Sequence, residues 1–201
     1  MKIPAVISIF LLCGCVSVPN SPNPRFYMLK SIDNSQLLNK SDAVSNVIIE
    51  VGPVRIPEYL DRPQIVTQDK NRMVNFAQFD RWGEPLDQGL GRVILEGLNM
   101  MLPGATIGIF PFNRAIPVNY QVIVDVIAIE SDLNNDIVFL VQWSLINAKN
   151  NRMFFTRRYE LRKPVEPHNY SGLVYTLSSE CASLSSDIAN AIVLIENKRR
   201  Q

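Results

Sequence analysis

Residues 120–162 have the sequence YQVIVDVIAIESDLNNDIVFLVQWSLINAKNNRMFFTRRYELR, in which three extended runs are separated by two polar turns. The first run, 120–129, is apolar on both alternating faces apart from Gln121 and Asp125, which predicts a central strand covered on both sides. The runs 137–145 and 153–162 alternate between apolar and polar residues, as half-buried strands do. Because Asn, Asp and Lys fill the turns, we expect an antiparallel meander.

Two segments have the three- and four-residue apolar spacing of an amphipathic helix. The first runs from Leu86 to Met101, with Pro85 suited to its first turn and Pro103-Gly104 stopping it. Its glycines, at positions 89, 91 and 97, predict that it lies close against the sheet. The second helix is expected from about Tyr170 to about Asn197. Its apolar stripe consists of Leu173, Leu177, Cys181, Leu184, Ile188, Ile192 and Ile195.

Shorter strands are expected in the N-terminal half of the chain. Val47–Val51 is a β-branched run that Gly52-Pro53 is expected to end, and the prolines of Arg55–Pro63 predict an irregular connection. Further strands are expected at 25–30 and 106–110, with a hairpin formed by 64–68 and 72–76. We therefore predict the α/β fold class: a single domain, residues 25–201, with a mixed, largely antiparallel sheet and two long amphipathic helices packed on it.

The N-terminus has the pattern of a bacterial lipoprotein signal. Lys2 precedes the apolar run Ile3–Leu12, which is shorter than the roughly 20 residues that a membrane-spanning helix needs. Leu12-Cys13-Gly14-Cys15 follows, and this is a lipobox, because lipidation requires a thiol with a small residue before it. Cys15 is favoured over Cys13, since the bulky Leu12 precedes Cys13. The alternative is an ordinary secretory signal with incidental cysteines.

The predicted mature chain begins with a lipidated tether. Residues 1–14 are the expected signal peptide, and residues 15–24 are rich in Pro, Ser and Asn, which favours an extended, flexible segment. Val16, rather than the Asp that usually retains lipoproteins in the inner membrane, favours the outer membrane facing the periplasm. Cys181 would be the remaining thiol, so no intrachain disulfide is expected. The net charge of +1 argues against nucleic-acid binding.

Signals of catalysis are weak. His168, the single histidine, stands in an expected loop, and its sequence proximity to Ser171 is poor evidence for a catalytic triad. No phosphate-binding glycine loop and no cluster of His and Cys for zinc occur in the sequence. Cys181 lies on the apolar helix stripe, which favours a core cysteine over a reactive thiol. We predict a non-enzymatic protein without a cofactor or metal.

Two segments carry a family resemblance. Residues 51–66, VGPVRIPEYLDRPQIV, and residues 79–86, FDRWGEPL, resemble the two signatures of the ABC-type transport auxiliary lipoproteins, the PqiC-like family, although Gly83 replaces a residue that is more often alanine. The lipobox and the early aromatics Phe26-Tyr27 also fit. The resemblance implies an α/β fold and no established catalytic residues. It also implies a partnership with MCE-domain proteins, which form periplasmic lipid conduits, and a role in outer-membrane integrity.

The two signature segments contain residue types that anchor protein interfaces, and their prolines lower the entropic cost of ordering. The predicted partner-binding residues are Arg55, Tyr59, Leu60, Arg62, Phe79, Arg81 and Trp82. The alternative is a structural corner, with Tyr59 and Trp82 packed under the sheet and Arg62 paired locally with Asp61 or Asp80. A stand-alone lipid- or peptidoglycan-binding envelope lipoprotein is the second functional hypothesis. The sequence leaves open whether the protein forms a homo-oligomer.

We expect Cys15→Ser to abolish lipidation and to leave uncleaved precursor, because a hydroxyl is a far poorer nucleophile than a thiol for this alkylation. Mass spectrometry of the mature N-terminus measures this outcome. Cys13→Ser is the matched control and should still be processed. A mature chain that begins at any residue other than Cys15 would rule out this anchor.

Overall fold

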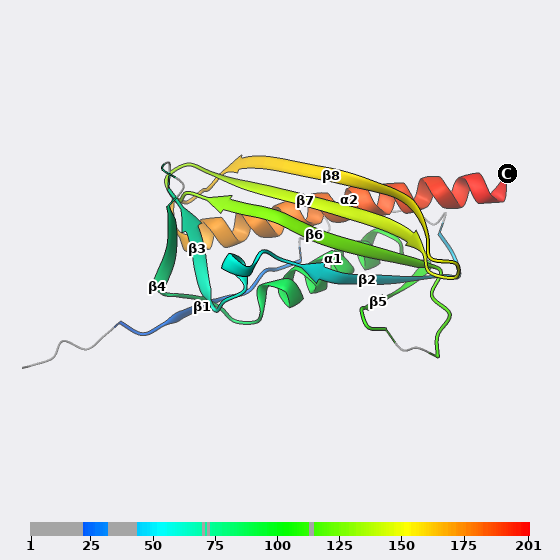
Figure 1. The fold of residues 1–201 in the computed structure, drawn as a ribbon, viewed down its shortest axis with the longest axis horizontal. Helices are drawn as coiled ribbons and strands as arrows, with labels where there is room; N and C mark the ends of the chain where they lie inside the picture. The colour runs from blue at the N-terminus through cyan, green and yellow to red at the C-terminus, as the bar shows by residue number, and fades with distance from the viewer. Residues whose placement is uncertain (1–21, 32–43, 70, 72, 113–114) are drawn as a thin grey trace, which may run out of the picture.

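The computed structural model describes residues 22–31, 44–69, 71, 73–112 and 115–201. The predicted lipid acceptor Cys15, the signal segment and most of the tether lie outside these residues. The described chain forms an α/β domain, shown in Figure 1. Its elements are β1 (Arg25–Tyr27), β2 (Val47–Arg55), the short 3-10 helix η2 (Glu58–Leu60), β3 (Gln64–Gln68), β4 (Val74–Trp82), α1 (Leu86–Met101), β5 (Ala105–Ile109), β6 (Tyr120–Ser131), β7 (Asp136–Asn147), β8 (Arg152–Pro164) and α2 (Tyr170–Arg200).

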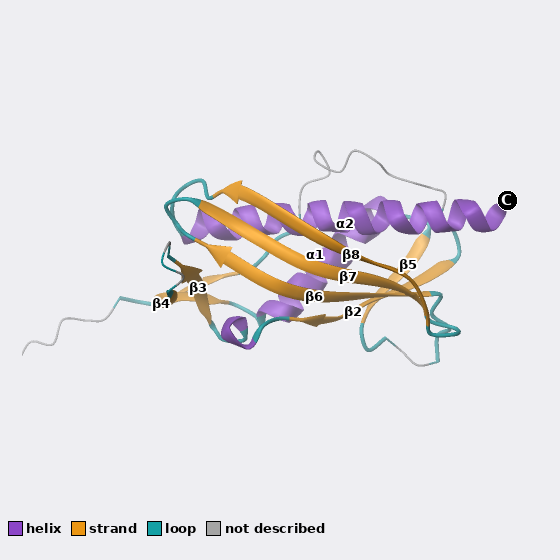
Figure 2. Cartoon of the chain, turned by 45° about the horizontal axis from the view of Figure 1, so that its top comes forward, coloured by secondary structure: helices purple, strands orange, loops and turns teal. Residues whose placement is uncertain are grey.

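A five-stranded sheet in the order β5-β2-β6-β7-β8 forms the body of the domain. β6, β7 and β8 pair antiparallel, which confirms the predicted meander, whereas β2 pairs parallel with both β5 and β6. Both helices lie behind this sheet in Figure 2. The predicted fold class is confirmed: a single α/β domain with mixed strand pairing and two long helices.

The strands divide into two sheets rather than one. β1, β4 and β3 form a separate three-stranded sheet, the small sheet, at the end of the molecule where the chain enters (Figure 1). The division occurs at the proline-rich connection, because β2 ends at Arg55 and η2 lies between Pro57 and Pro63. Proline cannot donate to a strand ladder, so the chain leaves the first sheet there and pairs anew.

β2 continues through Gly52-Pro53, so the prediction that this dipeptide ends the strand was wrong. The strand reaches Arg55 after a bulge in its pairing with β6 between Val51 and Val54. Gly52 has φ +117°, and a Cβ built there would lie 3.0 Å from the Phe110 Cβ. A glycine at the bulge therefore satisfies both the backbone conformation and the close approach of the chain after β5.

The central strand β6 is buried on one face. Its residues Tyr120, Val122 and Val124 are almost fully buried, whereas Ile127 is 43% exposed. The prediction that β6 is covered on both sides was wrong, because α1 and α2 lie on the same side of the sheet (Figure 2). Among the described residues, no helix covers the opposite face.

α2 supplies much of the core, together with the inward face of β7. Leu177, Cys181 and Ile188 are fully buried, as are Phe139 and Trp143 of β7. The Asn169 side chain caps the helix by accepting from Gly172 N at 2.9 Å. Among the described residues, no helix has the length and apolarity needed to span a membrane.

The glycines of α1 contact different neighbours. A Cβ at Gly97 would lie 2.7 Å from Ser185 Oγ, so this residue approaches α2 and not the sheet as predicted. A Cβ at Gly91 would lie 3.4 Å from a Val54 methyl and 3.6 Å from an Ile109 methyl, which are ordinary contacts. Gly97 therefore sets the separation of the two helices. Gly91 faces β2 and β5, where a methyl group fits without overlap.

We expect Gly97→Ala and Gly91→Ala to shift stability in opposite directions. The methyl group at position 97 would overpack the contact with Ser185, at a cost of about 1–3 kcal/mol. At position 91 the methyl group fits, and alanine stabilises a helix by about 0.5–1 kcal/mol relative to glycine. Thermal unfolding of the two variants measures the difference. Equal melting temperatures would contradict the contact at Gly97.

Cys181 is a core residue, and burial raises the pKa of its thiol above the ordinary value. We expect Cys181→Ala to fold with a loss of about 1–2 kcal/mol, as a modest truncation in the core. Leu177→Asp on the same stripe should unfold the domain, because it buries an unpaired charge. Circular dichroism melts compare the two. A Cys181→Ala protein that keeps its melting temperature but loses function would indicate a reactive thiol.

Candidate functional site

The two signature segments, residues 51–66 and 79–86, meet in space although part of the β3–β4 hairpin separates them. Antiparallel pairing puts Gln64 opposite Arg81, and the Trp82 amide donates to the Pro63 carbonyl at 2.7 Å. Residues 61–63 and 82–86 line a pocket of about 270 Å³ around this contact. The pairing of β3 and β4 thus joins both segments into one surface.

A second pocket, of about 350 Å³, lies between the start of the first signature segment, α1 and the end of β5. We call it the signature groove. Glu84 lines both this groove and the first pocket. Ile109 and Phe110 are exposed apolar residues on its wall. Its full lining is Val51, Gly52, Pro53, Val54, Glu84, Asp87, Gln88, Gly91, Arg92, Ile109 and Phe110.

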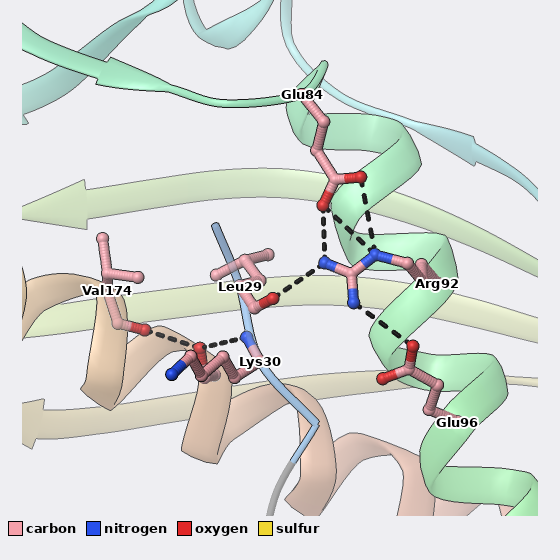
Figure 3. Close-up of polar contacts among 7 residues, drawn as sticks. Leu29, Lys30, Glu84, Arg92, Glu96 and Val174 are labelled. Atoms are coloured by element: carbon pink, nitrogen blue, oxygen red, sulfur yellow. Dashed lines mark hydrogen bonds and ion pairs between the residues drawn. The ribbon is translucent and has the colours of Figure 1, made fainter. Parts of the chain in front are cut away.

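Arg92 of α1 fixes Glu84 in place. Its guanidinium contacts the Glu84 carboxylate at 2.5 to 3.4 Å and Glu96 Oε1 at 3.3 Å (Figure 3). The hydrogen bond with Glu84 raises the pKa of Arg92, although burial opposes this shift. Because both groups are partly buried, the pair is less screened by water than an exposed ion pair.

The same guanidinium holds the segment that follows β1. Arg92 Nη2 donates to the Leu29 carbonyl at 2.7 Å, and the next residue, Lys30, donates its amide to Ser178 Oγ at 3.1 Å (Figure 3). Ser178 belongs to α2 and donates in turn to the Val174 carbonyl at 2.7 Å. The peptide group between Leu29 and Lys30 is therefore bound to both helices, through its carbonyl to α1 and through its N–H to α2.

Asp80, in the second signature segment, fixes β1 to the small sheet. This carboxylate is 4% exposed and accepts from Arg25 Nε, Arg25 Nη2 and the Tyr27 hydroxyl, each at 2.8 Å. Burial raises the pKa of Tyr27, and the hydrogen bond with Asp80 raises it further. The structural-corner alternative paired Arg62 with Asp61 or Asp80, whereas Asp80 forms a bidentate pair with Arg25.

The predicted partner-binding residues are divided between core and surface. Leu60 is buried in the hydrophobic core, and Trp82 is only 8% exposed where it lines the smaller pocket, so both side chains pack mainly inside the domain. Tyr59 is half-buried and accepts a hydrogen bond from the Ile129 amide at 3.4 Å. Aromatic and aliphatic residues anchor cores and interfaces alike, so residue type alone did not separate the two.

The four other predicted residues lie at or near the surface. Arg55 is exposed and pairs with Asp125 at 2.8 Å across β2 and β6. Arg62 stacks over the Phe76 ring at 4.1 Å, and Arg81 lies opposite Phe26 in the small sheet. Phe79 is partly buried. The pairing of β3 with β4 brings Arg62 and Arg81 to the same sheet, while Arg55 lies on the larger one.

Sequence reasoning missed Glu84 and Arg92 as a pair. Glu84 stands inside the second signature segment, and Arg92 follows eight residues later on the helix that begins at Leu86. An acidic residue just before a helix and a basic residue two turns into it is a detectable signal. The contact with the Leu29 carbonyl has no such signal, because it joins residues 63 positions apart.

The residues considered for catalysis are not assembled into a site. His168 is exposed in the turn before α2, and Cys181 is buried in the core. Within the described part of the chain, no three His, Cys, Asp or Glu side chains are grouped as metal ligands.

Comparison with known proteins identifies the family of the chain. Residues 27–189 match the family described as the ABC-type transport auxiliary lipoprotein component. The chain is also similar to the intermembrane transport lipoprotein PqiC of Escherichia coli (strain K12) and to that of Shigella flexneri, each 28% identical over 109 residues. The match covers 54% of this chain, and the chain spans about half, 56%, of each curated relative.

Solved structures share the fold. An uncharacterised protein superposes with a TM-score of 0.70 at 22% identity, covering 85% of this chain and 99% of its own. A protein from Xanthomonas campestris superposes with a TM-score of 0.69 at 11% identity, covering 88% and 98%. The family match includes both signature segments and most of the described domain. The chain therefore belongs to the family of ABC-type transport auxiliary lipoproteins.

Proposed function

We propose that the protein is a non-catalytic auxiliary subunit of an MCE-type intermembrane lipid transport system. In this proposal, lipidated Cys15 anchors it in the outer membrane facing the periplasm, where it supports membrane integrity. The family supports a membrane-anchored transport component, and the PqiC relatives are named as intermembrane transport lipoproteins. Their similarity to half of this chain supports a role in transport between membranes, and the lipid cargo and the MCE-domain partner are our proposal.

The observation that carries the proposal is that two separate signature segments form the walls of two pockets that share Glu84. A purely structural corner needs its polar groups satisfied and its apolar groups buried. Here Ile109 and Phe110 remain exposed beside the signature groove. Exposed apolar residues beside a concave surface are typical of a docking site for another protein.

The signature groove is suited to a protein partner because its walls are held before binding. Gln121 Nε2 donates to the Gly52 carbonyl at 3.0 Å, and Arg92 fixes Glu84. A preformed wall lowers the ordering cost of association. Asp87 and Gln88 in the first turn of α1 add polar groups to the groove lining. We propose that an apolar side chain of the MCE-domain partner enters this groove.

The stand-alone lipid-binding alternative needs an apolar cavity that encloses acyl chains. The two pockets at the signature segments hold about 270 and 350 Å³. Glu84 lines both of them, and Asp87 and Arg92 line the larger one. Both pockets are partly open to solvent, so they suit the insertion of one side chain of a partner better than the enclosure of acyl chains.

Filling the signature groove tests the proposal. We expect Gly91→Leu to fold and to lose most co-purification with the MCE-domain partner from detergent-solubilised envelope, because the new side chain occupies the groove between Val54 and Ile109. Excluding one anchor side chain of the partner lowers the binding free energy by about 2 kcal/mol or more, which corresponds to roughly a 30-fold loss of affinity.

Gly91→Ala is the matched control, because its methyl group makes only ordinary contacts and leaves most of the groove empty. It should be at least as stable as the wild type and should keep co-purification. A Gly91→Leu protein that retains its melting temperature and still co-purifies at the wild-type level would end the docking proposal for this groove. Absence of any MCE-domain protein from the wild-type pull-down would end the proposed partnership itself.

A further inference from the structure

The outward face of the small sheet carries exposed apolar and basic side chains together. Phe26 lies opposite Arg81, which lies opposite Gln64, and Val66 and Gln68 lie opposite Phe76 and Val74. Phe26 and Arg81 share a face because they are directly opposite each other, and Val74 and Phe76 share a face because they are two apart in β4. The register of β4 shifts between these two pairs, and the burial of Ala77 as well as Asp80 and Trp82 leaves Val74, Phe76 and Arg81 on the outer side. We call Phe26, Arg62, Val74, Phe76 and Arg81 the small-sheet face.

The apolar members of this face are strongly exposed. Phe26 is 66% exposed, Phe76 49% and Val74 39%. The opposite side of the same strands contains the buried Asp80 and Trp82. The small sheet thus has a core side and an outer side, and the outer side keeps two phenylalanines in contact with solvent. An apolar group of this kind marks a surface that contacts another phase or molecule.

Two arginines lie among these apolar groups without an acidic partner in the described part of the chain. Arg62 stacks on the Phe76 ring at 4.1 Å, and Arg81 lies opposite Phe26. The Nε atoms of both are buried and lack a hydrogen-bond acceptor among the described residues. Arg25, Arg55 and Arg92, in contrast, each pair with a carboxylate. Guanidinium groups beside aromatic rings are suited to binding phosphate oxygens.

The position of this face in the chain indicates what covers it. The small sheet lies at the end of the elongated domain where the N-terminal segment enters (Figure 1). Phe26 follows Cys15 by only 11 residues. At about 3.3–3.6 Å per residue, that chain reaches at most about 40 Å. The small-sheet face therefore includes β1, the strand that follows the predicted lipid anchor most closely along the chain.

We propose that the small-sheet face rests on the lipid surface that holds the anchor. Phe26, Val74 and Phe76 enter the headgroup region, and Arg62 and Arg81 bind lipid phosphates. Aromatic side chains are favoured at the membrane–water interface, and long cations extend to its phosphates. This inference rests on the proposed lipidation of Cys15. It leaves the signature groove, which shares none of these residues, for the protein partner.

Fluorescence quenching in vesicles tests the contact. The full chain is reconstituted in vesicles of phosphatidylethanolamine and phosphatidylglycerol that include a lipid with a nitroxide headgroup. A fluorescent maleimide is placed at Val74→Cys, and in a separate protein at Leu194→Cys, which is 56% exposed on α2. Cys181 is fully buried and does not compete for the label. We expect the probe at position 74 to lose most of its fluorescence and the probe at 194 to keep it.

A second variant connects the quenching to the face. Phe26→Ser with Phe76→Ser in the Val74→Cys protein should restore the fluorescence to the level of the probe at 194. Met153→Ser with Tyr175→Ser, at exposed residues outside the face, is the control and should leave the quenching unchanged. Phe26→Ser alone repeats the test at the most exposed residue of the face, where loss of folding is not expected.

Equal quenching at both probes, or quenching that the serine changes do not alter, would overturn the proposal. An unquenched probe at 74 together with serine variants that lose the MCE-domain partner would assign the face to protein docking and would also overturn it. Mass spectrometry of the same sample separates the two levels of inference. A lipidated protein with an unquenched probe overturns this inference alone, whereas an unlipidated Cys15 overturns the proposed anchor as well.

Discussion

The arrangement of the domain depends on the contacts of the Arg92 guanidinium. Its guanidinium reaches Glu84 before α1, Glu96 on α1 and the Leu29 carbonyl after β1. Without this cation, the carboxylate of Glu84 and the carbonyl of Leu29 would be left without the partner that the fold provides, and a partly buried polar group without a partner is costly. The small sheet, the second signature segment and α1 thus share one charged centre, and the walls of the signature groove depend on it.

The spacing of apolar residues along the chain predicted the elements whose burial it determines directly. The meander and both helices follow from apolar spacing, and Leu177, Cys181 and Phe139 are in the core as expected. The coverage of β6 did not follow, because the exposure of Ile127 depends on where distant helices pack. The division into two sheets was signalled by Pro57 and Pro63, but which strands pair afterwards is a long-range property.

The candidate site was predictable in outline from the two signature segments. Their contact, between Trp82 and Pro63, follows from a hairpin that the turn chemistry indicated. Which apolar side chains are buried and which are exposed was not predictable. Leu60 and Trp82 pack inside the domain, whereas Phe26 and Phe76, which were not predicted as partner contacts, are exposed. Burial depends on which face a bulge or a register shift presents, and β4 contains such a shift between its pairings with Gln64 and Val66.

Residues 29–30 also decide how the domain responds to a mechanical pull. A force applied to the segment before β1 reaches Asp80 through Arg25 and then passes to α1 through Leu29 and to α2 through Lys30. The load is therefore divided between both helices at once.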